Sequence, residues 1–211
     1  MTTDGRAQRE SDLISYYTNE VRDRQDRELP DSRVRVRAAY LRHLAAEGRR
    51  SVVEIGCGPG RDGEAFAEAG FAYTGVDLAP ASVEACRSLG LNAQVGSVLE
   101  LPFEDATFEA GWTMSTLLHV ADADLDQALA EIVRVLRPGA PVGIGLWGDE
   151  VGGERVWQDE SGFGPGRFFS IRTDSVMQEA LARHGTVEQW LSWRDGDGPM
   201  HYQWAVLRTP A

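Results

Sequence analysis

The chain is poor in the residues that build disulfides and metal sites. Its 211 residues include two cysteines, Cys57 and Cys86, and four histidines, with no Cys-x-x-Cys pair. This scarcity argues against a disulfide framework, and no side chains have the spacing of zinc ligands, so we expect no metal. Apolar runs are short as well, and none approaches the ~20 residues that cross a bilayer. We therefore expect no membrane partner.

Positive charge is also scarce, because 21 basic residues face 33 acidic ones and leave a net charge of −12. Such a chain repels a phosphate backbone, which argues against nucleic acid as a partner. Residues 1–6 are polar and precede no apolar segment, unlike a secretory signal, so we expect a cytoplasmic protein. The length suits one globular unit, and we expect a monomer or a homodimer.

Apolar runs and turn-forming residues alternate in a way that is typical of strands followed by helices. The expected strands occupy residues 51–55, 72–76, 92–96, 107–112, 141–147, 186–193 and 201–208. The helices expected among them occupy residues 61–69, 80–88, 124–136 and 173–184. This order predicts a doubly wound, Rossmann-like α/β fold with helices on both faces of a mostly parallel, seven-stranded sheet.

Three segments complete the prediction. Residues 1–48 are expected to form an N-terminal helical cap, with helices at 11–27 and 32–47, ahead of a main domain at 49–211. Residues 148–166 mix many glycines with acidic and aromatic residues, a composition that predicts an irregular lid. The sequence Asp-Gly-Asp-Gly-Pro at 195–199 predicts a hairpin turn, so the last strand should run antiparallel to its neighbour.

The most informative stretch is residues 52–60, which read Val-Val-Glu-Ile-Gly-Cys-Gly-Pro-Gly. Closely spaced glycines between a strand and a helix let a ligand approach bare backbone N–H groups, so this stretch predicts a small-molecule site. Asp77 ends the next expected strand, where a carboxylate can accept hydrogen bonds from both hydroxyls of a ribose. The dinucleotide fingerprint would need a glycine at position 61, which is Arg61. The pattern favours a nucleoside cofactor other than a dinucleotide.

With Glu54 ahead of the glycines and Asp77 one strand later, the chain resembles the class I S-adenosylmethionine (SAM)-dependent methyltransferases. Within that class it is similar to a small bacterial group with a methyltransferase type 11 domain. The likeness continues at 96–103, 108–120 and 131–139. The group often has an acidic residue at the position of Ser97 to bind the adenine amino group; a serine hydroxyl can also accept a hydrogen bond.

The resemblance and the motif together define the expected site. The expected cofactor-binding residues are Tyr17, Glu54, Gly56, Cys57, Gly58, Gly60, Arg61, Asp77, Leu78, Ser97, Val98 and Met114. Trp147, Phe169 and His201 are expected at the acceptor. His119 follows the fourth strand at the edge where open α/β sheets bind ligands, and it is the candidate general base; a structural role for this histidine stays open.

The resemblance implies SAM as cofactor and methyl transfer to a small molecule by direct displacement at the methyl carbon. Two other functions stay open at this point. One is a regulator or assembly partner that binds SAM without methylating anything. The other is an NAD-dependent oxidoreductase, which Glu54 and the glycine spacing disfavour.

Overall fold

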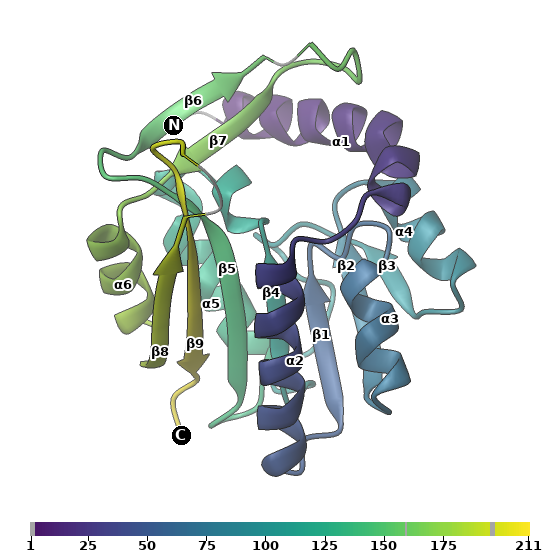
Figure 1. Cartoon of the computed structure of the whole chain (residues 1–211), viewed down its shortest axis with the longest axis vertical. Helices are drawn as coiled ribbons and strands as arrows, with labels where there is room; N and C mark the ends of the chain where they lie inside the picture. The colour runs from purple at the N-terminus through teal and green to yellow at the C-terminus, as the bar shows by residue number, and fades with distance from the viewer. Residues whose placement is uncertain (1–2, 159, 195–196) are drawn as a thin grey trace.

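The computed structural model describes residues 3–158, 160–194 and 197–211. Seven strands form one sheet in the order β3-β2-β1-β4-β5-β9-β8 (Figure 1). They are β1 (Ser51–Ile55), β2 (Ala72–Asp77), β3 (Ala93–Val95), β4 (Gly111–Met114), β5 (Pro141–Gly148), β8 (Thr186–Trp193) and β9 (His201–Arg208). Along the sheet, neighbours pair in parallel from β3 through β2, β1 and β4 to β5. Strand β9 runs antiparallel to both β5 and β8. The predicted fold class is confirmed; the first two residues of the expected turn at 195–199 lie outside the described residues.

Helices cover both faces of this sheet. The helices are α1 (Thr3–Asp26), α2 (Asp31–Ala46), α3 (Arg61–Glu68), α4 (Pro80–Ser88), α5 (Leu125–Val135) and α6 (Asp174–Ala182). One core cluster joins α5 and α6 to one face of the sheet, and a second joins α2, α3 and α4 to the other. In the part of the chain that the structure describes, no helix is long and apolar enough to cross a membrane.

Helix α5 illustrates why these residues form these elements. Its buried positions recur at helical spacing and give one apolar stripe for the sheet. These positions are Leu125, Ala128, Leu129, Ile132 and Val135. The helix ends at the turn before β5, where Gly139 has a φ of 69°, which glycine adopts without steric cost.

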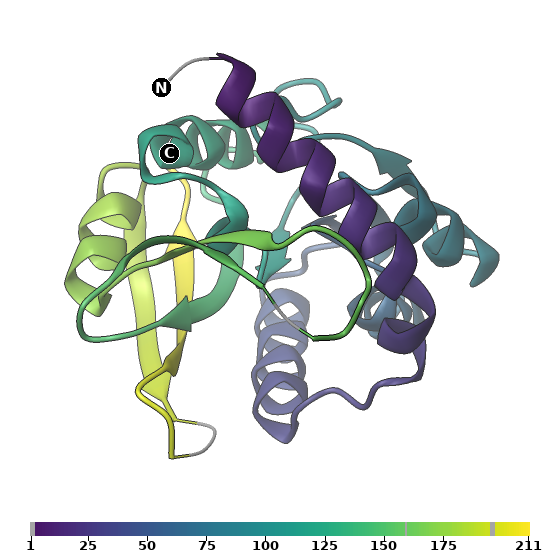
Figure 2. The same cartoon turned by 90° about the horizontal axis from the view of Figure 1, so that it is seen from above.

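Helix α1 differs from the others because it lies across the carboxyl ends of the strands (Figure 2). It packs against α4 and against strand β7 (Arg167–Ile171). Strand β7 pairs with β6 (Gly153–Trp157) as a separate antiparallel hairpin. We call α1 and this hairpin the cover. Tyr16 of α1 is buried and contacts Phe163 of the loop between β6 and β7 at 5.8 Å between ring centroids.

Two sequence predictions need correction. Residues 148–166 contain strand β6 and are not wholly irregular. All five residues of β6 are exposed, and its sequence has no apolar alternation to reveal a strand. Strand β4 begins at Gly111 and not at 107, because Phe108 first pairs with Leu136 after α5. Residue 159 of the expected lid lies outside the described part of the chain.

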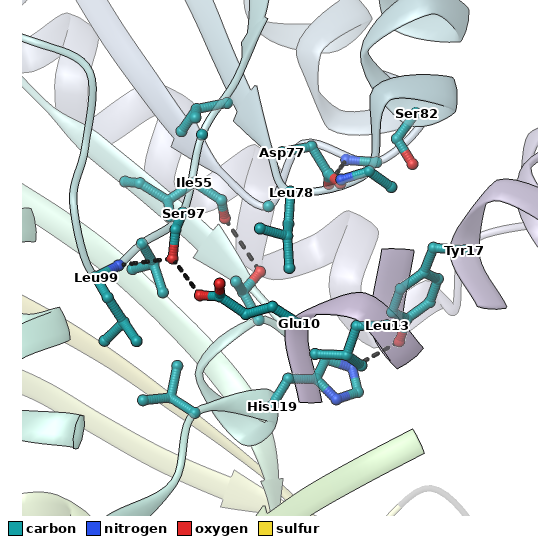
Figure 3. A pocket seen from close by; sticks show the side chains of 18 of the residues that line it. Glu10, Leu13, Tyr17, Ile55, Asp77, Leu78, Ser82, Ser97, Leu99 and His119 are labelled. Atoms are coloured by element: carbon teal, nitrogen blue, oxygen red, sulfur yellow. Dashed lines mark hydrogen bonds between the residues drawn. The ribbon is translucent and has the colours of Figure 1, made fainter. Parts of the chain in front are cut away.

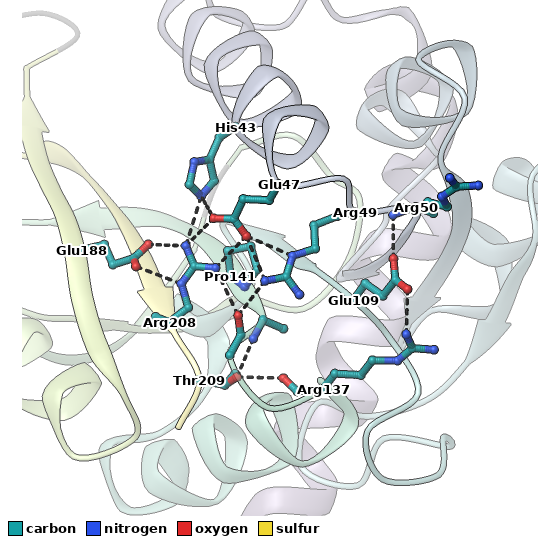
Figure 4. Close-up of polar contacts among 12 residues, drawn as sticks. His43, Glu47, Arg49, Arg50, Glu109, Arg137, Pro141, Glu188, Arg208 and Thr209 are labelled. Carbon is teal, nitrogen blue, oxygen red and sulfur yellow. Dashed lines mark hydrogen bonds and ion pairs between the residues drawn. The ribbon is translucent and has the colours of Figure 1, made fainter. Parts of the chain in front are cut away.

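The opposite, amino edge of the sheet is held by ion pairs (Figure 4). Arg208, at the end of β9, donates to Glu47 after α2 at 2.5 Å and to Glu188 of β8 at 2.8 Å. Arg49 also donates to Glu47, at 3.0 Å. These bonds lower the pKa of Glu47 to about 2, with the Arg208 bond as the main cause. Ion pairs therefore join α2, β8 and β9 at the edge of the sheet that lies away from the cover.

Candidate functional site

A cavity of about 120 Å³ lies at the carboxyl edge of the sheet. The ends of β1, β2, β3 and β4 form its floor, and α1 forms its roof (Figure 3). The strand order reverses between β1 and β4, which is where open α/β sheets bind ligands. Pockets that hold drug-sized ligands measure roughly 300–1,000 Å³. With α1 in this position the cavity is smaller than such pockets, so the helix partly closes it.

The glycine turn, residues 56–60, is fixed by backbone hydrogen bonds. The N–H groups of Gly56 and Cys57 both donate to the carbonyl of Val76, at 2.8 and 3.1 Å. Gly56, Gly58 and Gly60 have φ angles of 76°, 51° and 91°. Side chains with a Cβ rarely adopt such angles, so the glycine spacing follows from the path of the turn.

Two of these glycines are required for different reasons. A Cβ on Gly56 would lie 1.9 Å from Oγ1 of Thr116, in the turn after β4. A Cβ on Gly58 would meet no atom of the described residues within 4 Å, and Gly58 lines the cavity. Gly56 is therefore required by packing within the protein, whereas Gly58 leaves open space against the backbone.

Asp77 is half-buried in the cavity wall, at the end of β2. Its Oδ1 accepts the N–H of Ala79 at 2.9 Å, and its Oδ2 accepts the N–H of Gly58 at 2.8 Å. Burial raises the pKa of Asp77, and these two N–H groups together with Arg24 oppose that rise. Each carboxylate oxygen keeps a further lone pair. Asp77 can therefore accept hydrogen bonds from the hydroxyl groups of a ligand in the cavity.

The cavity lining brings together most of the residues predicted from the sequence. Those in the lining are Tyr17, Gly56, Gly58, Asp77, Leu78, Ser97, Val98, Met114 and His119. The predicted residues outside the lining are Glu54, Cys57, Gly60, Arg61, Trp147, Phe169 and His201.

Glu54, predicted among the cofactor-binding residues, lies outside the cavity lining and beneath the turn. Its side chain is fully buried and its Oε2 accepts the Tyr73 hydroxyl at 2.6 Å. Strand side chains alternate between faces, so Glu54 points into the layer of α3 and not toward the cavity edge. Burial, together with the charge of Asp62, raises the pKa of Glu54 well above its usual range. Its Oε1 has no hydrogen-bond partner among the described residues.

Cys57 and Gly60 also serve the packing beneath the turn. Cys57 is buried in the core cluster that α3 and α4 share. A Cβ on Gly60 would lie 3.0 Å from Leu91 and 3.1 Å from the sulfur of Cys86. Both positions are therefore explained by contacts within the protein.

Arg61 joins the glycine turn to the far end of α1. Its guanidinium donates to the backbone carbonyls of Gln25, at 2.6 Å, and of Arg24, at 3.3 Å. It also donates to the carbonyl of Arg27. Cations are favourable near the carboxyl end of a helix, where carbonyls lack intrahelical partners. Arg61 therefore anchors the roof of the cavity to its floor.

His119 is held by two hydrogen bonds below the cover. Its Nδ1 lies 2.8 Å from the carbonyl of Phe168, and its Nε2 lies 2.6 Å from the Tyr17 hydroxyl. Because a carbonyl only accepts, Nδ1 carries the proton, and the Nε2 lone pair accepts from Tyr17. Burial lowers the pKa of His119 to about 3. The imidazole is therefore neutral at neutral pH.

The three residues predicted at the acceptor lie in different places. The Phe169 ring is 4.8 Å from the His119 ring and so adjoins the cavity. Trp147 packs edge-on against Tyr202 at 5.2 Å. His201 is hydrogen-bonded to Asp174, with Nε2 and Oδ1 2.6 Å apart. Only Phe169 approaches the site in this conformation.

Besides the predicted Tyr17, the roof contains residues that the sequence interpretation missed. From α1 the cavity receives Arg6, Arg9, Glu10, Leu13, Tyr17 and Arg24. Positions 6, 10, 13 and 17 follow the spacing of one helix face, which is the signal that could have identified them. Only Tyr17 of this helix was predicted at the site, because charged residues on a helix usually face solvent.

Comparison with known proteins shows a likeness to methyltransferases. Residues 52–139 match a family profile described as a methyltransferase domain. The stretch from β1 to the turn before β5 is therefore similar to a methyltransferase domain. The match begins in β1 and ends in the turn before β5, so it includes the glycine turn and Asp77.

Similar proteins extend this likeness to other methyltransferases. The chain is 31% identical over 110 residues to the O-methyltransferase resE of Aspergillus sclerotiorum, covering 48% of this chain and 41% of that one. It is 34% identical over 107 residues to a probable tocopherol O-methyltransferase of Oryza sativa, covering 46% and 29%. The chain thus spans less than half the length of these relatives.

A solved structure shares the methyltransferase fold over the whole chain. It is the 1,6-didemethyltoxoflavin-N1-methyltransferase of Burkholderia thailandensis, with bound 1,6-didemethyltoxoflavin and S-adenosylhomocysteine. The TM-score is 0.75 at 24% identity, with 100% of this chain and 92% of that chain covered. At this identity the likeness concerns the fold.

Proposed function

We propose that this chain is a class I SAM-dependent methyltransferase, which transfers a methyl group from SAM to a small-molecule acceptor by direct displacement. The observation that carries the proposal is one cavity in which Asp77, the open side of Gly58 and Met114 meet beneath α1. When bound, SAM supplies a methyl group already activated by a sulfonium. The protein then has to align the acceptor and exclude water.

The lining residues fit such a ligand from end to end. Asp77 would hold the ribose hydroxyls, and Gly56 and Gly58 would let the amino acid portion approach the backbone. Ser97 and Val98, one strand farther from β4, would receive the base. The sulfur end would then face the other side of the cavity, where Met114 and His119 lie.

His119 is proposed as a positioning residue for Tyr17 and not as the final proton acceptor. A base with a pKa of about 3 holds a proton poorly at neutral pH. The Nε2 lone pair instead keeps the Tyr17 hydroxyl over the cavity. For an acceptor that reacts through a free lone pair, alignment and closure by the cover are enough.

The acceptor itself is proposed to be a small molecule bound on the side of His119 and Phe169. The named functions of the relatives are O- and N-methyltransferases. Aromatic rings surround this side: Phe169 contacts His119 at 4.8 Å and Trp157 at 5.6 Å. Such rings favour an apolar or aromatic acceptor. Trp147 and His201 would join the acceptor site only if the cover moved.

Calorimetry with S-adenosylhomocysteine tests the cofactor site. The wild-type chain should bind it, and Asp77→Ala should weaken binding by roughly 1.5–3 kcal/mol, the range of hydrogen bonds to a charged group. Asp105→Ala, at an exposed carboxylate outside the cavity, is the matched control and should bind as wild type does. Binding of NADH without any binding of S-adenosylhomocysteine would refute the proposal.

Turnover is tested separately, by incubating the chain with labelled SAM and a panel of phenols, amines, thiols and carboxylates. Formation of S-adenosylhomocysteine together with a labelled product is expected for at least one class. Intact cofactor binding without transfer to any class would favour a regulator or assembly partner that only binds SAM.

A further inference from the structure

The loop after β3 has a neutral residue at the cavity, and α1 brings a carboxylate to it. Ser97 lies two residues beyond the end of β3 and donates its hydroxyl to Oε1 of Glu10 at 2.9 Å. The same hydroxyl oxygen accepts the N–H of Leu99 at 3.3 Å. Ser97 and Glu10 both line the cavity, although 87 residues separate them in sequence. Figure 3 shows Glu10 pointing inward from α1, toward Ser97.

Charge distinguishes Glu10 from Ser97 as a hydrogen-bond acceptor. The Glu10 side chain keeps 29% of its surface exposed, and Arg6 Nε lies 3.7 Å from its Oε1. A carboxylate offers about four lone-pair positions, so Ser97 and Arg6 leave acceptor capacity. Hydrogen bonds to an ionised acceptor are roughly twice as strong as those between neutral groups. The strongest acceptor near the end of β3 thus comes from the roof.

The position of Glu10 along the cavity indicates which part of a nucleoside it faces. Asp77, at the end of β2, pairs with Val95 of β3 in the sheet register. Ser97 and Glu10 therefore lie on the side of Asp77 that is away from β4 and His119. If Asp77 holds the ribose, the base extends toward Ser97 and Glu10.

We propose that Glu10 of α1 accepts a hydrogen bond from the exocyclic amino group of adenine and so makes the site select for adenosine ligands. This role rests on the proposed function. On binding, the amino group replaces the Ser97 hydroxyl at the carboxylate, so Glu10 stays partnered in both states. The N-terminal helix thereby reads the base while it closes the cavity.

The test compares two ligands: S-adenosylhomocysteine and its 6-deamino analogue, in which hydrogen replaces the amino group. Wild type should bind the adenine ligand about tenfold more tightly or better, as expected for a hydrogen bond to a charged group. Glu10→Ala should lose about tenfold for the adenine ligand and change the analogue by less than about threefold. Glu10→Gln keeps a neutral acceptor, so its affinity for the adenine ligand should lie between those of wild type and Glu10→Ala.

Asp12→Asn is the matched control, because it removes one negative charge from the same helix outside the cavity lining. It should retain the wild-type preference for the amino group. If Glu10→Ala instead binds each ligand as tightly as wild type does, or more tightly, Glu10 only latches α1 to Ser97 and the inference is wrong. If the wild-type chain binds neither ligand, the proposed function itself fails.

Discussion

The glycine turn and the cover border the same cavity, but they are held in different ways. The turn is fixed by its own backbone, whose N–H groups donate to Val76 and Asp77. The cover is held by side chains that meet across the sequence: Tyr17 meets His119, and Glu10 meets Ser97. A backbone-built floor can be shared by many relatives. A side-chain roof can change from one to the next and so set what the site accepts.

The largest expected difference between the two regions is in how much the residues beneath them contribute to the stability of the fold. Asp62 follows the glycine turn, is fully buried, and accepts hydrogen bonds from Arg33 at 2.6 Å, Arg37 at 2.7 Å and Trp112 at 2.8 Å. Burial alone would raise the pKa of Asp62, but these partners outweigh it and lower the pKa. Asp62→Ala removes the fully buried carboxylate that pairs with the partly buried Arg33 and Arg37, and it should cost about 3–5 kcal/mol of unfolding free energy, measured by urea denaturation.

The matched control is Asp124→Ala, which breaks an ion pair under the cover. Asp124 lies 3.0 Å from Arg9, and its side chain keeps 23% of its surface exposed. About 0–1 kcal/mol should be lost there. Equal losses of unfolding free energy in the Asp62 and Asp124 variants would show that the glycine turn and the cover are equally well fixed.

Two glycines in the turn should separate folding from binding. Gly56→Ala should be strongly destabilising, since a left-handed backbone costs about 1–2 kcal/mol and overlap with Thr116 adds about 1–3 kcal/mol. Gly58→Ala should show only the first cost, yet its methyl group enters the space beside the turn and should weaken S-adenosylhomocysteine. Thermal melts and calorimetry measure both. A Gly58→Ala variant with wild-type affinity would place the ligand elsewhere.

The pH dependence of stability should reveal how firmly the cover is closed. His119 has a pKa of about 3 when buried, against about 6.5 in an unfolded chain. Below pH 6.5 the unfolded state gains a proton that the folded state refuses, so stability falls as pH falls. The expected loss from this group is roughly 2 kcal/mol between pH 7 and pH 5.

The contribution of His119 is isolated by comparison with His119→Gln. Other titrating groups act in both proteins, so the difference between their unfolding free energies should shrink as pH falls from 7 to 5. Parallel curves would mean that the imidazole is already accessible to protons in the folded chain. The cover would then be mostly open in solution.

The fold was predictable from the sequence because its signals are local. The runs at 51–55, 186–193 and 201–208 coincide with β1, β8 and β9, and Pro80 begins α4 as expected. The glycine turn and Asp77 were predictable for the same reason, since both belong to one βαβ unit. Where pairing depends on distant partners, as for Phe108 and Leu136, the predicted start of β4 was wrong.

The roof could not be predicted in the same way, since its contacts join residues far apart in the chain. Glu10 acquires its role only when α1 lies beside Ser97. Glu54 shows the reverse case: it belongs to the motif read from the sequence, but the alternation of β1 turns its side chain toward Tyr73. A motif thus identifies a position in the fold, while the neighbouring elements decide whether that side chain meets the ligand.

The anchoring of α1 by Arg61 has a mechanical consequence. One end of a 24-residue helix is tied to the turn after β1, while Glu10 lies toward its other end. At ~1.5 Å per residue such a helix is ~36 Å long, so pivoting it by about 10° lifts the other end by roughly 6 Å. Access would then widen first at the Ser97 side, and a ligand would enter at that side.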